Sequence, residues 1–159
     1  MIEERNRRDR IEELKIKSKR KNICSELTGI IDNIEINSFI SIKDTIEISK
    51  RIYEKMDALS SQEKINKDIK TNLAVIAELK SEYAIYSNEC AVLFHSEDRE
   101  CGAIKVKVED FFNHLVDIFE LTSFAKGHRD LIFVHENLKF GICIERYEYF
   151  NKLVVWKSE

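Results

Sequence analysis

The spacing of apolar residues changes about halfway along this chain, and that change constrains the fold more than any other feature of the sequence. Up to about residue 86, large apolar side chains recur every three or four positions, as on the buried face of a helix. Beyond residue 89, short apolar runs alternate with polar residues, as in half-buried strands. Helices followed by strands predict an α+β fold in which helices pack against an antiparallel sheet.

Three N-terminal helices are expected. Residues 23–34 follow helical spacing, so a first helix should run from the charged N-terminus through this segment. Ser41 with Asp44 resembles an N-cap that begins a second helix, which should end near Leu59. The third helix is predicted over residues 60–86.

Two patterns predict the third helix. Ser60 and Glu63 have the spacing of a capping box, in which each side chain accepts a hydrogen bond from a free backbone N–H group. The apolar residues that follow are spaced close to a heptad, as in coiled-coil packing. This spacing leaves open whether the helices pack within the fold or form a homodimer.

The second half predicts the order β-β-α-β-β-β. Residues 90–95 and 103–108 should form a hairpin, and a helix should run from Glu109 until Gly127 stops it. Three further strands are expected at 131–135, 139–147 and 152–157. The simplest arrangement is one antiparallel sheet with that helix on one face and the N-terminal helices on the same face or at one end.

Residues 1–86 are expected to form a helical layer with a basic N-terminal arm, and residues 87–159 a sheet with one packed helix. A length of 159 residues is typical of one domain, and no proline-rich linker divides the chain, which contains no proline. We therefore expect a single compact domain.

The location of the protein is predicted from two absences. No apolar run approaches the ~20 residues that a membrane helix needs. The charged N-terminus also lacks the apolar stretch of a secretion signal. We expect a cytoplasmic protein without a membrane partner.

The cysteines are predicted to be structural thiols. The four are widely spaced and include no Cys-x-x-Cys pair, and the apolar neighbours of Cys90 and Cys143 favour burial. We therefore expect no metal and no other cofactor. The alternative is that Cys90, His95 and Cys101 converge on a metal ion, with His114 as a fourth ligand.

The charge of the chain is split between its ends. Residues 1–22 hold nine basic and five acidic side chains, a net of +4, which leaves 17 basic against 24 acidic and a net of −7 for the rest. A basic arm on an acidic body indicates that charge complementarity selects a partner.

An interaction protein is favoured over an enzyme, because the sequence contains no complete catalytic motif. An acidic body with a strand-rich second half fits a bacterial immunity or antitoxin-type protein that neutralises a basic toxin, such as a nuclease, by covering it with carboxylates. The candidate contact residues are five acids and three aromatic side chains: Glu97, Asp98, Glu100, Glu145, Glu148, Tyr147, Tyr149 and Trp156. Ordinary core packing is the alternative role for the aromatic side chains.

The basic arm supports a second hypothesis, a regulator that binds nucleic acid. Its candidate phosphate contacts are Arg5, Arg8, Lys15 and Lys19. The alternative is a solvated helix stabilised by ion pairs between residues three and four apart.

A small hydrolase or nuclease is the third hypothesis. His128 is a candidate general base oriented by Asp130, and Asp130 with Glu145 could hold a magnesium ion. Tyr147, however, occupies the position where a Glu-x-Lys nuclease pattern needs lysine. The structural alternatives are that Asp130 caps a turn and that Glu145 forms a cross-strand ion pair with a residue such as Lys157.

Overall fold

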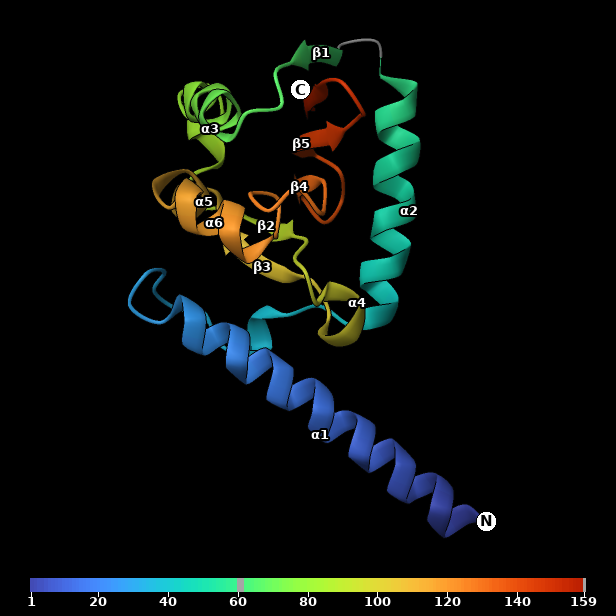
Figure 1. Ribbon diagram of the computed structural model, residues 1–159. Coiled ribbons are helices and arrows are strands. Elements are labelled where there is room, and N and C mark those ends of the chain that lie inside the picture. The colour runs from blue at the N-terminus through green and yellow to red at the C-terminus, as the bar shows by residue number, and fades with distance from the viewer. Residues whose placement is uncertain (60–61, 159) are drawn as a thin grey trace.

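The computed structural model describes residues 1–59 and 62–158 and has an α+β fold (Figure 1). Its centre is a six-stranded antiparallel sheet with the order β1-β6-β5-β4-β2-β3. The strands are β1 (Gln62–Ile65), β2 (Cys90–Leu93), β3 (Ile104–Lys107), β4 (Leu131–Val134), β5 (Phe140–Arg146) and β6 (Asn151–Lys157). The α-helices are α1 (Ile2–Leu27), α2 (Ile42–Ala58), α3 (Ile69–Glu78), α4 (Asp98–Cys101), α5 (Val108–Asn113) and α6 (Leu115–Leu121), and η1 (Ile36–Ser38) and η2 (Ala84–Tyr86) are 3-10 turns.

The central strands are apolar on both faces. In β5, Ile142 and Ile144 belong to one hydrophobic cluster, whereas Cys143 belongs to the other. Because successive side chains of a strand point to opposite faces, both faces of this sheet must be covered.

Helices cover the two faces unequally. On one face, α3, α5 and α6 supply buried residues such as Ile76, Phe111 and Phe119. On the other face lies α2, which contributes Ile52 and Met56 (Figure 1). The expectation that all N-terminal helices share one face or one end was therefore wrong, because the sheet is apolar on both sides.

Helix α1 begins as predicted in the basic arm but ends earlier than predicted, at Leu27. Gly29 has a φ of 84°, a left-handed conformation that stops a helix readily, so residues 30–34 lie outside it. Only Ile23 and Leu27 of the helix are buried. The N-terminal part of α1 projects beyond the rest of the molecule (Figure 1).

Helix α2 confirms the sequence prediction at both ends. The Ser41 hydroxyl accepts a hydrogen bond of 3.0 Å from the Asp44 N–H group, as an N-cap should, and the helix closes at Leu59. The cap and the apolar face therefore agree on the position of this helix.

The prediction of the third helix was wrong for Gln62–Ile65, which form β1, and for the length of the helix. Ser60 lies outside the described residues, and Glu63 lies in β1, opposite Leu153 of β6. Helix α3 begins later, where Asp68 caps the N–H group of Thr71 at 2.9 Å. A helix of 10 residues is too short for the heptad packing that its spacing indicated.

The second half confirms the predicted order of strands and the β2–β3 hairpin. The long predicted helix is divided instead into α5 and α6, because His114 between them has φ −132° and ψ 38°, outside the helical range. Within the described residues, no helix is both long enough and apolar enough to cross a membrane.

The α2 cap gives a direct test of this fold. Ser41→Ala should lower the free energy of unfolding by about 1 kcal/mol, because the Asp44 N–H group loses its acceptor. Urea denaturation measures this change. Ser18→Ala, in the exposed middle of α1, is the matched control and should not lower it; an equal loss in both variants would contradict the capping role.

Candidate partner-binding surface

The turn between β5 and β6 brings four of the predicted contact residues together. The strands are paired as far as Arg146 and Asn151, and the Tyr147 N–H group closes the turn on the Phe150 carbonyl at 3.0 Å. Glu145 lies two residues after Cys143, so its side chain points to the same face, the one that α2 covers. Tyr147 and Tyr149 extend from the turn beyond it.

The Tyr147 ring of this turn is fixed by its neighbours, whereas Tyr149 is open to solvent. The Tyr147 ring stacks on Phe150 with centroids 5.2 Å apart, and the Lys152 ammonium lies 4.9 Å from the Tyr147 ring centre. Tyr147 is 38% exposed and Tyr149 is 83% exposed. A large exposed tyrosine beside a fixed one is typical of the anchors of protein interfaces.

The charges of two further carboxylates act on Glu145 beside these rings. Burial raises the pKa of Glu145, and the charges of Asp130 and Asp57 raise it further, whereas Lys152 opposes the shift. The same carboxylates, after burial, raise the pKa of the Tyr147 hydroxyl. We call Asp57, Glu145, Tyr147, Glu148 and Tyr149 the hairpin patch.

The surroundings of Glu145 favour the binding of a cationic group from a partner. A carboxylate with a raised pKa is destabilised in its charged form, so a cation placed beside it gains more than beside a solvated acid. Lys152 stands opposite Glu145 in the strand register, which corrects the predicted pairing with Lys157. Lys157 lies instead 4.0 Å from Glu82.

The predicted acids of residues 97–100 do not belong to this patch. Asp98 is buried, not exposed as expected, because its carboxylate accepts from the His95 N–H group and from Arg129 at 3.1 Å. Glu100 pairs with Lys19 of α1. Two of these acids, Asp98 and Glu100, are thus already paired within the chain.

Trp156 also lies away from the surface, as the alternative of core packing predicted. Its indole N–H donates to the Leu138 carbonyl at 2.9 Å, and its ring lies over Gly141, where a Cβ atom would clash with it. It is 8% exposed and belongs to the cluster beneath α2.

The four predicted phosphate contacts of the arm divide into two kinds. Arg5 and Arg8 are exposed, and no ion pair involves them in the part of the chain that the structure describes. Lys15 lies 3.6 Å from Glu12, and Lys19 pairs with Glu100. Two of the four therefore have acidic neighbours within the chain.

His128 and Asp130 do not form the predicted catalytic pair. The Asp130 carboxylate accepts hydrogen bonds from the Tyr53 hydroxyl at 2.8 Å and from the Arg146 N–H group at 2.9 Å. No hydrogen bond joins it to the exposed His128 ring within residues 1–59 and 62–158. Asp130 thus joins α2 to the end of β5, and its charge adds to the field at Glu145.

The thiols lie in different surroundings. Cys101 and Cys143 are buried as predicted, and burial raises the pKa of Cys101 to about 11. Cys90 is exposed, which corrects the prediction of a core thiol. Among the described residues, no three His, Cys, Asp or Glu side chains converge as metal ligands would.

His95 has a structural role. Its ring Nδ1 accepts from the Glu97 N–H group at 3.1 Å, and its Nε2 lies 2.8 Å from the Gly102 carbonyl. Burial lowers the pKa of the ring, in keeping with a neutral imidazole that donates through Nε2.

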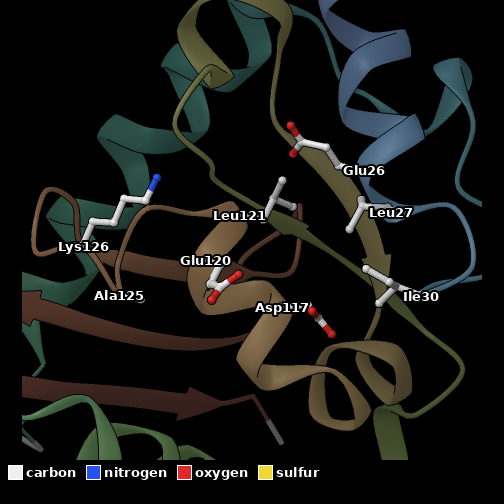
Figure 2. A pocket seen from close by; sticks show the side chains of 8 residues that line it. All are labelled: Glu26, Leu27, Ile30, Asp117, Glu120, Leu121, Ala125 and Lys126. Carbon is white, nitrogen blue, oxygen red and sulfur yellow. The ribbon is translucent and has the colours of Figure 1, made fainter.

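Sequence reasoning missed an acidic cleft of about 500 Å³ between the end of α1 and α6. In Figure 2, Asp117 and Glu120 project from α6, while Glu26 and Leu27 approach from the end of α1 and Ile30 from the turn that follows it. The two sides lie about ninety positions apart in the sequence, so no local pattern could have predicted it.

Two comparisons with known proteins identify relatives. The model of the YxiF protein family matches residues 23–156 of the chain. The uncharacterized protein YxiF of Bacillus subtilis (strain 168) is 30% identical over 84 residues, which cover 52% of this chain and 54% of that protein. The aligned segment therefore spans about half the length of this curated relative. No solved structure matches the chain.

The surroundings of Glu145 predict a pH-dependent effect on stability. Its pKa is raised in the folded state, so the folded protein loses stability relative to the unfolded chain as pH rises from below the ordinary value through the folded one. Glu145→Gln should therefore raise the urea midpoint at pH 7.

The gain should vanish in acid, below the ordinary pKa of glutamate at about 4, because wild-type Glu145 is then protonated and, like the glutamine, carries no charge. Glu148→Gln, in the exposed part of the turn, is the control and should show no such pH dependence. A lower midpoint for Glu145→Gln at pH 7 would contradict the electrostatic interpretation.

Proposed function

The chain belongs to the YxiF protein family, and we propose that it is a non-enzymatic, protein-binding module of the immunity type. Its partner on this proposal is a basic protein, such as a nuclease toxin, whose cationic surface is covered by the hairpin patch. The observation that carries the proposal is that the half-buried Glu145, on which the charges of Asp130 and Asp57 act, lies two residues from the exposed Tyr147.

The destabilised charge of Glu145 supports this role. A lysine or arginine of a partner would relieve the repulsion among the three carboxylates, and charge-assisted hydrogen bonds are the stronger kind. The stacked Tyr147 would be buried at the centre with little entropic cost, because Phe150 already fixes its ring.

The hairpin patch is a better candidate than the acids of α4. A charge reversal at Asp98 would leave Arg129 without its buried partner and would therefore damage the fold. Glu145, half-buried near the end of β5, and Glu148, exposed in the turn, have no ion-pair partner among the described residues and can be reversed together, with Asp117 and Glu120 of the cleft as a matched acidic pair.

Affinity capture from the native cell tests the proposal. The wild-type protein should retain a protein of high isoelectric point, identified by mass spectrometry. The double variant Glu145→Lys and Glu148→Lys should associate with that protein at least about tenfold more slowly, because exposed charges act mainly on the association rate. Tyr149→Ala should instead speed dissociation.

The cleft variant Asp117→Lys and Glu120→Lys carries the same change in net charge and should bind as the wild type does. Denaturation midpoints of both variants establish that folding is preserved. Equal losses of partner binding in the two variants would show that only net charge matters. Loss of binding in the cleft variant alone would place the interface at the cleft. Either result would overturn the proposal for the hairpin patch.

A further inference from the structure

We propose that the outward face of α1 is a docking surface for the phosphate backbone of a nucleic acid. This inference goes beyond the proposed function, since the hairpin patch does not involve α1. The face carries a row of residues spaced alternately three and four apart, so that they lie above one another along the helix. The basic members of this row, which we call the basic row, are Arg7, Arg10, Lys17 and Lys21.

The orientation of α1 is set by its contacts with the body. Ile16, Ile23 and Leu27 pack against the core, so their side of the helix faces the protein. Arg7 lies opposite Ile16, the other members of the basic row lie between these two sides, and all four are exposed. Lys17 and Lys21 also line a cavity beside Ile36 of η1. The basic row differs from the predicted set of arm residues, in which Arg5 and Arg8 lie on other sides of the helix and Lys15 and Lys19 pair with acids of the chain.

The charges of α1 are segregated around its axis. Asp9, Glu12 and Glu13 precede Ile16 by three to seven residues and therefore lie on its side of the helix. Between Arg7 and Lys21 the row itself contains no acid, and an acid from another segment, Glu35, lines a cavity with Lys17 and Lys21. Of the α1 side chains, only Lys15 and Lys19 form ion pairs with acids within the described residues, so the basic row is free to bind phosphate.

The projection of α1 separates Arg7 and Arg10, the N-terminal members of the basic row, from the acidic body. Arg7 precedes Ile16, the first α1 side chain packed on the core, by nine residues, which is about 14 Å of helix. Charges are largely screened beyond about 8 Å at physiological ionic strength. A polyanion can therefore approach Arg7 and Arg10 without strong repulsion from the body.

The exposed apolar side chains of α1 are too few for a lipid or protein groove. Ile11 is 44% exposed and Leu14 is 58% exposed, but Ser18 occupies the next position of their row. Groove-binding helices use apolar anchors that continue over at least two turns, and membrane-surface helices need a broad apolar face. Four cations around two apolar residues fit phosphate better.

The dimensions also suit a duplex. From Arg7 to Lys21 the basic row extends about 21 Å along the helix axis. Over that length a duplex presents about a dozen phosphates, so each cation of the basic row has a phosphate within reach.

Fluorescence anisotropy with a labelled 20-base-pair DNA duplex and the full chain tests the proposal. If four cations neutralise phosphates, the logarithm of affinity should fall with the logarithm of salt concentration with a slope of about −3.6, roughly 150-fold between 50 and 200 mM salt. The variant with Arg7, Arg10, Lys17 and Lys21 changed to Glu should lose that binding at least about 100-fold at 50 mM salt.

The matched control reverses four other exposed cations: Lys43, Lys50, Arg51 and Lys70. It carries the same change in net charge and should keep most of the affinity. The double variant Glu145→Lys and Glu148→Lys should bind the duplex as the wild type does. Failure of this inference can therefore be distinguished from failure of the proposed function. Circular dichroism of each variant establishes that α1 remains helical.

Three results would overturn the inference. The first is a wild-type protein that does not bind the duplex at 50 mM salt. The second is an equal loss in the basic-row variant and its control. The third is preferential binding to phosphatidylglycerol vesicles or to polyglutamate that is lost in the double variant Ile11→Ser and Leu14→Ser, because that would assign the face to a lipid surface or to an acidic protein.

Discussion

The burial of the central strands on both faces is the constraint on which the rest of the structure depends. Leu131 and Phe133 of β4 lie in one hydrophobic cluster, while Ile132 and Val134 lie in the other. A sheet of this kind has no solvated face, so α2 must lie across it from α3, α5 and α6. This arrangement places Asp57, at the end of α2, where its charge acts on Glu145 of β5 in the hairpin patch.

A second constraint fixes the direction of the arm. The Arg20 guanidinium donates to the Cys101 carbonyl at 2.7 Å and to the Ile40 carbonyl at 3.2 Å, and it lies over the Phe39 ring. Gly102 permits this close approach, because a Cβ atom there would collide with the Ile40 carbonyl. A helix held at one end in this way presents its free side consistently, as a docking surface requires.

Sequence reasoning succeeded where local chemistry decides the structure. The Ser41 cap and the alternation in β3 depend on neighbours within a few residues, and both were confirmed. It failed where a distant segment decides: Gln62–Ile65 forms a strand because the edge of β6 is available to it, although its local pattern favoured a helix. The burial of Asp98 likewise depends on Arg129, thirty-one residues away, and no local signal announces that pair.

The length of α2 explains how one small chain can carry two charged surfaces of opposite sign. The acids of the hairpin patch gather at the C-terminal end of α2, whereas α1 passes the other end of that helix (Figure 1). Because α2 has 17 residues, the two ends lie about 25 Å apart. This distance is several times the screening length at physiological salt, so neither surface cancels the field of the other. Opposite charges that would neutralise each other in a smaller fold are thereby kept apart, as the two proposals require.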